Sequence, residues 1–125
     1  MNKRILVIDD EERIQEVIQT CLEILCGWEV LTAGSGKEGL LKAETQPPDA
    51  ILLDVSLPEM DGFTIFQRLQ ENPVTHSIPV VLLTAKVQSA DRAKFTQLGV
   101  AGVIIKPFDP VQLAAQVALA VGWNF

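Results

Sequence analysis

The sequence contains few of the residues that bind transition metals, with two cysteines and one histidine among 125 residues. Cys21 and Cys26 follow no metal-ligand or redox spacing, and on a helix they would lie about 140° apart around its axis. We therefore expect two buried, reduced thiols, which suits the cytosol. His76 falls in a predicted loop after Pro73, where we expect an ordinary surface residue.

Long apolar runs and an excess of basic residues are also missing. No apolar stretch approaches the roughly 20 residues of a membrane span, and the run after the basic start MNKR is too short for the core of a signal peptide. The net charge is −6 and the pI is near 4.6. This balance argues against nucleic acid and against an anionic membrane as partners. We expect a cytoplasmic protein that binds neither DNA nor membranes.

Hydrophobic residues make up 48% of the chain, which is enough for a packed core and argues against disorder. The length suits one domain, and no stretch has the composition of an interdomain linker. We therefore treat residues 1–125 as a single domain.

Four apolar runs each end in a reactive polar group. The first run is followed by Asp9 and Asp10, and the second ends at Asp54. The third ends at Thr84, and the fourth ends at Lys106. Continuous apolar, β-branched runs are typical of strands buried on both faces. The predicted strands are Arg4–Ile8, Trp28–Thr32, Ala50–Asp54, Ile78–Thr84 and Gly102–Ile105.

Between these strands the apolar residues recur at helical spacing. A first helix is predicted from Glu11 to the stop at Gly27, and a second from the cap Ser35 to Glu44, with Glu38 as capping-box partner. The remaining predicted helices are Phe63–Leu69, Ser89–Leu98, ended by Gly99, and a last helix capped by Asp109, begun by Pro110 and running to about Val121.

The strand–helix unit thus occurs five times, which predicts an α/β fold with a five-stranded parallel sheet and helices on both faces. In such a sheet all strands point the same way, and ligands bind at the carboxyl ends of the strands. We therefore expect five side chains to converge there: Asp9, Asp10, Asp54, Thr84 and Lys106.

This set of side chains favours phosphoryl chemistry. Three carboxylates and one ammonium sum to −2, which a divalent cation neutralises; hard oxygen ligands without His or Cys point to Mg²⁺, or to Mn²⁺ in its place. A carboxylate can also be the nucleophile that forms an aspartyl phosphate, and Asp54 on the central-looking strand is the candidate. Asp9 and Asp10 would hold the metal, while Lys106 and Thr84 would neutralise the phosphoryl oxygens. Capping of the first helix is the alternative role for the two N-terminal aspartates.

The chain resembles response-regulator receiver domains, the chemotaxis-protein type of two-component signalling. The motifs are VIDDEE (7–12), LLDVSLPEMDGF (52–63), LLTA (82–85) and KPF (106–108), in order along nearly the whole chain. The resemblance implies a flavodoxin-like (βα)5 fold with strand order 2-1-3-4-5. It also implies Asp54 as phospho-acceptor, Asp9 and Asp10 as the acidic pair, Thr84 as switch hydroxyl and Lys106 as the lysine that contacts the phosphoryl group.

Other positions follow from the resemblance alone. Ser56 stands where the family uses a backbone carbonyl as metal ligand, and Ser56 and Lys86 stand where it tunes dephosphorylation. The Lys106-Pro107 bond is typically cis in such domains. One departure concerns the rotating aromatic of the family, which lies three residues before the lysine, because this chain has Val103 there.

The resemblance implies a phospho-accepting signalling module rather than an enzyme. A sensor histidine kinase or a phosphotransfer protein would phosphorylate Asp54, and a separate downstream protein would read the result, since no output domain follows in this sequence. The last helix carries no charged residue from Val111 to Val121 and is a candidate docking face for a partner or a second copy. Two alternatives remain, namely a phosphohydrolase that works through an aspartyl phosphate, and an unphosphorylated scaffold.

Overall fold

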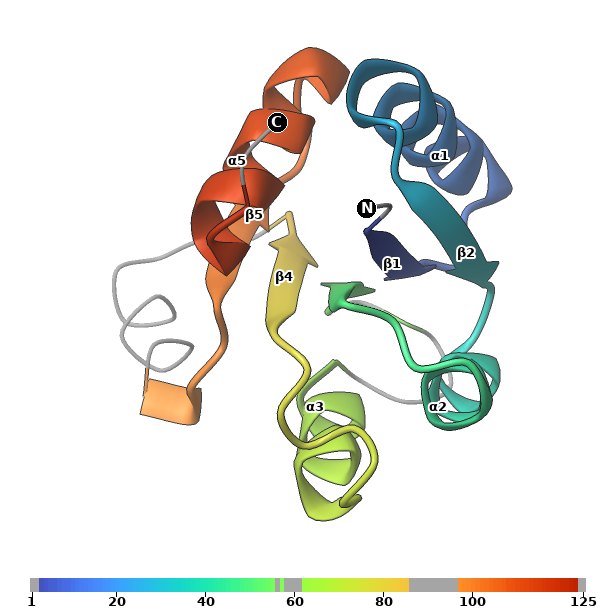
Figure 1. Cartoon of the computed structure of the whole chain (residues 1–125), viewed down its shortest axis with the longest axis vertical. Coiled ribbons are helices and arrows are strands. Elements are labelled where there is room, and N and C mark those ends of the chain that lie inside the picture. The colour runs from blue at the N-terminus through green and yellow to red at the C-terminus, as the bar shows by residue number, and fades with distance from the viewer. Residues whose placement is uncertain (1–2, 56, 58–61, 86–96, 124–125) are drawn as a thin grey trace.

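The computed structural model describes residues 3–55, 57, 62–85 and 97–123. Within them, strands and helices alternate along the chain (Figure 1). The strands are β1 (Arg4–Ile8), β2 (Glu29–Ala33), β3 (Ala50–Asp54), β4 (Val80–Thr84) and β5 (Gly102–Ile105). The helices are α1 (Glu12–Cys26), α2 (Gly36–Thr45), α3 (Gly62–Glu71) and α5 (Pro110–Val121).

The five strands form one parallel sheet in the order β2-β1-β3-β4-β5. The predicted fold and strand order are therefore confirmed, and β3, which ends at Asp54, is the central strand. The second strand begins at Glu29 instead of Trp28, and the fourth at Val80 instead of Ile78. Of the predicted helix Ser89–Leu98, residues 89–96 lie outside the described residues, as does most of the predicted loop at 55–62.

Helices cover both faces of the sheet, with α1 and α5 on one side and α2 and α3 on the other (Figure 1). Because side chains alternate along a strand, each strand contributes to two cores. In β1, for example, Ile5 and Val7 pack toward α1 and α5, while Leu6 and Ile8 pack toward α2 and α3. This double burial explains why the strands are apolar at every position.

Local signals fix several helix ends. Gly27 ends α1 in the left-handed region with φ 68°, and the Asp109 side chain accepts the Val111 N–H at the start of α5. Ser35 accepts the Glu38 N–H as predicted. The Glu38 carboxylate, however, accepts the N–H of Gly34 instead of Ser35, so the predicted capping box is displaced by one residue.

Cys21 and Cys26 are free thiols and only half-buried, so the predicted full burial is wrong. The reason is that α1 directs Ile18 and Leu22 into the core and places the thiols beside that face. His76 is exposed, as predicted. None of the helices among the described residues is long and apolar enough to cross a bilayer.

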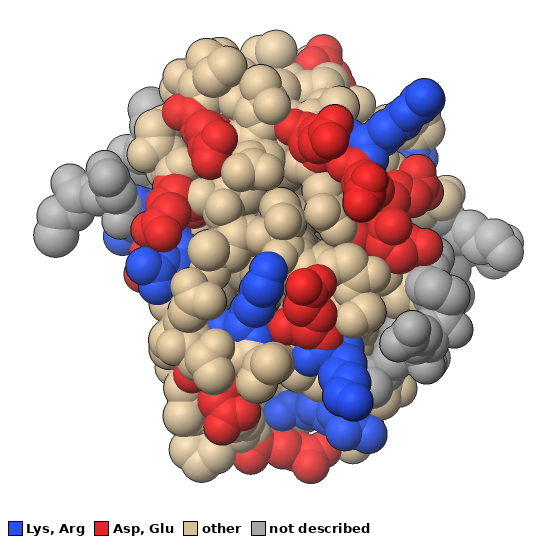
Figure 2. Space-filling model, turned by 90° about the vertical axis from the view of Figure 1, so that its right-hand side faces the viewer, with Lys and Arg blue, Asp and Glu red and all other residues tan. Residues whose placement is uncertain are grey.

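Charged side chains of both signs are mixed on the side of the molecule that carries α1, β2 and α2 (Figure 2). Lysine and arginine side chains lie beside aspartates and glutamates there, and broad uncharged areas separate them. Among the described residues, this face does not form the continuous basic surface on which a nucleic-acid backbone binds.

Replacement of Gly39 by alanine tests how closely α2 packs on the sheet. A Cβ at this position would lie 2.5 Å from Cδ1 and 2.8 Å from Cγ1 of Ile8, a fully buried side chain. We expect Gly39→Ala to lower the free energy of unfolding by about 1–3 kcal/mol because the core would be overpacked. Urea unfolding followed by circular dichroism measures this.

Gly34→Ala is the matched control, because a Cβ there meets its nearest atom at 3.7 Å. It should leave stability within about 0.5 kcal/mol of wild type. Equal effects of the two substitutions would contradict the close approach of α2 to β1.

Candidate functional site

Three carboxylates meet at the carboxyl edge of the sheet. Asp9 and Asp10 directly follow β1, and Asp54 is the last residue of the neighbouring β3. One oxygen from each carboxylate lies within 4.8 Å of the other two. The predicted convergence of these residues is therefore observed, and it follows from the parallel direction of the two adjacent strands.

The three carboxylates differ in burial. Asp9 and Asp54 are buried, whereas Asp10 is exposed. Asp9 Oδ1 accepts the backbone N–H of Glu11 at 2.9 Å, just before α1 begins. This bond fixes the loop between β1 and α1, but it does not cap the helix, because Glu11 is the N-cap residue and α1 receives no side-chain cap hydrogen bond. The alternative role of the two aspartates as caps of the first helix is therefore not observed.

Lys106 brings an ammonium into this cluster from the end of β5. Its Nζ lies 3.2 Å from Asp9 Oδ2 and 3.4 Å from Asp54 Oδ2. Its backbone N–H donates to the carbonyl of Thr84 at 2.8 Å, which ties the start of the β5–α5 loop to β4. The following Lys106-Pro107 peptide bond is cis, as the resemblance implied.

The ionisation of the cluster reflects burial and mutual charge. Burial is the main reason why the pKa of Asp9 is raised, and the nearby charge of Asp54 adds to it, while the Glu11 N–H and Lys106 act in the opposite direction. Burial by itself would lower the pKa of Lys106. The charges of Asp9 and Asp54 outweigh burial, so the pKa of Lys106 is raised and its ammonium form is favoured.

The cluster has the donor set and spacing of a magnesium site. Its three carboxylates and one ammonium sum to −2, and two carboxylates about 5 Å apart repel each other by roughly 3 kcal/mol at an effective dielectric of 20. Opposite ligands of octahedral Mg²⁺ are separated by about 4 Å, so oxygens within 4.8 Å of one another fit one ion with small adjustments. All three donors are hard oxygens, which disfavours zinc.

Thr84 lies on the strand next to Asp54. It is the buried last residue of β4, and β4 pairs with β3 so that Asp54 is opposite Leu83. Because Leu83 is the register partner of Asp54, Thr84 lies one residue further toward the carboxyl end of the adjacent strand. It is therefore at the same edge of the sheet as the carboxylates. Ser56 and Lys86, the other positions taken from the resemblance, lie outside the described residues.

Gln15 is a residue that the sequence reading missed. Its side-chain amide donates to the backbone carbonyl of Asp9 and, at 3.2 Å, to that of Ala33 at the end of β2. It therefore connects the two loops that follow β1 and β2 and helps to hold Asp9 in place. The helical spacing assigned Gln15 to the polar face of α1, and only its half-buried position distinguishes it from the solvated residues there.

Val103 occupies the position of the aromatic switch that the resemblance implied. It is half-buried on β5, opposite Leu82 of β4, and packs against the core between the sheet and the helices α2 and α3. A valine side chain is too small to exchange between a buried and an exposed position in the way a ring does.

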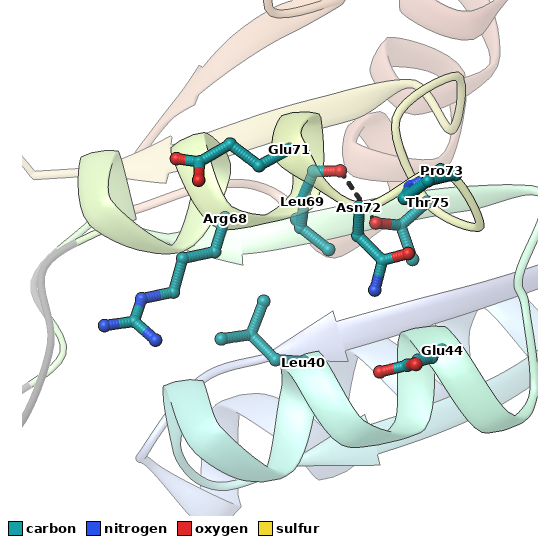
Figure 3. A pocket seen from close by; sticks show the side chains of 8 residues that line it. All are labelled: Leu40, Glu44, Arg68, Leu69, Glu71, Asn72, Pro73 and Thr75. Carbon is teal, nitrogen blue, oxygen red and sulfur yellow. Dashed lines mark hydrogen bonds between the residues drawn. The ribbon is translucent and has the colours of Figure 1, made fainter.

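Two further hollows are lined by residues other than the three carboxylates. An apolar hollow of about 420 Å³ is lined mainly by α1 and the β5–α5 loop, including Ile14, Val17 and Phe108, and reaches Lys106. A second, of about 490 Å³, lies between α2 and α3, where Arg68 of α3 and Leu40 of α2 point into the space between the two helices (Figure 3). Its buried Thr75 donates to the Leu69 carbonyl, so this groove offers no reactive group comparable with the acidic cluster.

Comparisons with known proteins identify the family of this chain. Residues 5–118 match the family described as response regulator receiver domain. The chain is 43% identical over 117 residues to the alkaline phosphatase synthesis transcriptional regulatory protein PhoP of Bacillus subtilis, covering 94% of this chain and 48% of that protein. It is 42% identical to the response regulator PleD of Caulobacter vibrioides, again over 94% of this chain but 26% of that protein. The chain thus spans about half the length, or less, of these relatives.

Solved structures show the same architecture. The chemotaxis protein CheY4 of Vibrio cholerae superposes with a TM-score of 0.89 at 28% identity, covering 96% of this chain and 99% of that one. The N-terminal domain of a response regulator receiver protein from Methanoculleus marisnigri gives a TM-score of 0.78 at 34% identity, with 98% of both chains covered. Fold, acidic cluster and family match therefore agree: the chain belongs to the receiver domains of two-component response regulators.

Proposed function

We propose that Asp54 is the residue that accepts the phosphoryl group. The observation that carries this proposal is the position of its carboxylate on the central strand, within 4.8 Å of the carboxylate oxygens of Asp9 and Asp10 and 3.4 Å from the Lys106 ammonium. An Asp54 oxygen would attack the phosphorus of a phosphohistidine. The N–P bond of the donor then breaks as the O–P bond of the aspartyl phosphate forms.

Asp9, Asp10 and Asp54 would hold a Mg²⁺ ion, together with the backbone carbonyl of Ser56. Bound Mg²⁺, or Mn²⁺ in its place, supplies positive charge beside the phosphoryl oxygens and brings the sum of the cluster to zero. The buried Asp9 would act mainly through water, and the exposed Asp10 is open to direct coordination.

Phosphorylation of Asp54 would change the local charge by about −1. Lys106 and Thr84, which lie at the same edge of the sheet, would then donate hydrogen bonds to the new phosphoryl oxygens. Hydrogen bonds to a charged group contribute about 1.5–3 kcal/mol each, enough for two of them to shift an equilibrium between two conformations. Because Val103 replaces the aromatic, we propose that the response is read at the strand ends and their loops instead of through a buried ring.

As receiver domains are signalling domains, the chain acts through other proteins, and its own catalysis is limited to assisting gain and loss of the phosphoryl group. We propose a histidine kinase or phosphotransfer protein as donor, a downstream protein as target, and the cytoplasm as location. PhoP of Bacillus subtilis is a transcriptional regulator. For this chain we propose no direct contact with DNA or membranes. The uncharged α5 is the proposed surface for contact with a second copy.

Acetyl phosphate with Mg²⁺ tests the phospho-acceptor. Intact mass spectrometry should show one added phosphoryl group on the wild-type chain and none on Asp54→Asn. Asp49→Asn is a matched control, since Asp49 is an exposed aspartate one residue before β3. It should be modified like wild type.

Two outcomes would contradict the proposal. Steady turnover of a chromogenic phosphate monoester with Mg²⁺ would support a phosphohydrolase instead. Failure of beryllofluoride with Mg²⁺ to alter Trp fluorescence or the amide NMR spectrum, together with no added mass, would support an unphosphorylated scaffold.

Asp10→Asn tests the metal site. Removal of one of three neighbouring carboxylates relieves repulsion, so without metal we expect the melting temperature to rise by a few degrees, equivalent to about 1 kcal/mol. Addition of Mg²⁺ should then stabilise the variant much less than wild type. Calorimetric melting with EDTA and with Mg²⁺ measures both effects, and an unchanged Mg²⁺ response would place the ion elsewhere.

Lys106→Gln separates metal binding from the response to phosphorylation. Loss of the ammonium changes the sum of the cluster from −2 to −3, so Mg²⁺ should bind several-fold tighter, up to about tenfold. Beryllofluoride should nevertheless cause a smaller spectral change because one donor is gone. Lys37→Gln, on an exposed lysine of α2, should alter neither quantity. Weaker Mg²⁺ binding by Lys106→Gln would contradict the assigned contacts.

A further inference from the structure

Asp9 is held at each of its polar groups. Its N–H donates to the Ala33 carbonyl at the end of β2, at 3.0 Å, and its own carbonyl accepts the side-chain amide of Gln15. Its two carboxylate oxygens accept the Glu11 N–H at 2.9 Å and the Lys106 ammonium at 3.2 Å. Asp9 is therefore fixed relative to β2, α1 and β5.

The neighbouring Asp10 has no such restraint on its side chain. It is exposed, and no hydrogen bond or ion pair to another described residue holds its carboxylate. One of its oxygens nevertheless lies within 4.8 Å of oxygens of Asp9 and Asp54. The backbone must therefore place Asp10 in the cluster.

The peptide group between Asp9 and Asp10 is the part of the backbone that does this. A peptide group is planar, so its oxygen and the Cα of the following residue lie in one plane. The oxygen of this peptide group is the Asp9 carbonyl, to which the Gln15 amide donates. Gln15 thus fixes the plane from which the Asp10 side chain projects.

Gln15 is itself anchored to the sheet. The same amide nitrogen donates to the Ala33 carbonyl at 3.2 Å, and an amide nitrogen carries the two N–H groups that two carbonyls require. Ala33 is buried and is paired with Ile8 of the adjacent β1 (Figure 1). Lys42 of α2 donates to the carbonyl of the preceding Thr32. Gln15 therefore ties the loop after β1 to a fixed point at the edge of the sheet.

A polar hollow lies beside Gln15 and Asp10. It has a volume of about 280 Å³, lies between the beginnings of α1 and α2, and is lined by these two residues together with Glu38 and Lys42, among others. Without the bond from Gln15, the Asp10 carboxylate has room to turn into this hollow and away from Asp54.

We infer that Gln15 is a positioning residue for Asp10 and that it sets the preference of the acidic cluster for Mg²⁺ over larger cations such as Ca²⁺. The inference rests on the magnesium site proposed above. Mg²⁺ requires nearly octahedral oxygens at about 2.0–2.1 Å, whereas Ca²⁺ accepts about six to eight oxygens at about 2.3–2.6 Å in variable arrangements. A carboxylate that can move therefore weakens the binding of Mg²⁺ more than that of Ca²⁺.

Charge does not distinguish the two cations. Mg²⁺ and Ca²⁺ carry the same charge, so a cluster of three carboxylates and one ammonium attracts both equally at a given distance. Gln15 is uncharged, and its replacement by another uncharged residue leaves the charge of the cluster unchanged. A change in the ratio of the two affinities therefore reports the placement of Asp10.

NMR titration of the full chain with Mg²⁺ and, separately, with Ca²⁺ tests the inference. Gln15→Met keeps the length of the side chain and removes both donors. We expect its dissociation constant for Mg²⁺ to rise about tenfold or more, since loss of a group that orients a ligand weakens metal binding by about 10–100-fold. The dissociation constant for Ca²⁺ should rise by less than about threefold, so the preference for Mg²⁺ falls.

Gln19→Met is the matched control. Gln19 lies one helical turn further along α1, and its amide donates to the Glu23 carboxylate at 3.3 Å. Both dissociation constants should stay as in wild type, and circular dichroism confirms that both variants are folded. Equal weakening of Mg²⁺ and Ca²⁺ binding in Gln15→Met, no weakening, or the same changes in Gln19→Met would overturn the inference.

A readout without metal separates this inference from the proposed site. In EDTA, hydrogen exchange at the amides of Asp9 and Glu11 should be several-fold faster in Gln15→Met than in wild type, relative to the amides of β3. Unchanged exchange at these two amides would overturn the role of Gln15. A wild-type chain that binds neither cation would overturn the magnesium site as well, whereas equal Mg²⁺ binding by wild type and Gln15→Met would overturn the role of Gln15 alone.

Discussion

The contact of Lys106 with Asp9 and Asp54 is the interaction around which the functional edge of this protein is organised. Two buried carboxylates and an exposed one gather within a few ångströms, and a single ammonium, 3.2 and 3.4 Å from the buried pair, offsets part of their repulsion. The arrangement is electrostatically incomplete, since its formal sum is still −2. A site of this kind favours a divalent cation and, with it, a phosphoryl group.

The rest of the fold keeps these charges together. Strands buried on both faces by two separate cores hold β1, β3 and β5 in one direction and register, so their last residues cannot move apart without breaking the core. Gln15 connects the loops after β1 and β2, and the Lys106 N–H connects the β5–α5 loop to Thr84. The free energy of core packing thus maintains a cluster that would repel itself in a flexible chain.

The two surfaces of the molecule have different chemistry. The carboxyl edge of the sheet carries three neighbouring carboxylates, whereas α1 and α5 expose apolar side chains such as Ile24 and Leu119. Val103 stands on β5 where the resemblance to receiver domains implied an aromatic residue, and it packs against the core that α2 and α3 cover.

The sequence alone determined the fold class, the strand order through its motifs, and the residues of the acidic cluster. It could do so because buried parallel strands are apolar throughout, and because parallel strands deliver their last residues to one edge. The residues Asp9, Asp54 and Lys106 were identifiable for that reason. Periodicity defines the face of an element but not its degree of exposure, so the half-buried thiols of Cys21 and Cys26 were predicted as buried.

Only the tertiary structure decided which polar side chains meet across elements. It showed that Gln15 joins two loops, that Glu38 binds Gly34 instead of Ser35, and that Lys106 pairs with both buried carboxylates. It also placed α1 and α5 on the same core beside each other, although the end of α1 at Cys26 and the start of α5 at Pro110 are far apart in the sequence. Such contacts depend on how separate elements pack, and local sequence carries no signal for that packing.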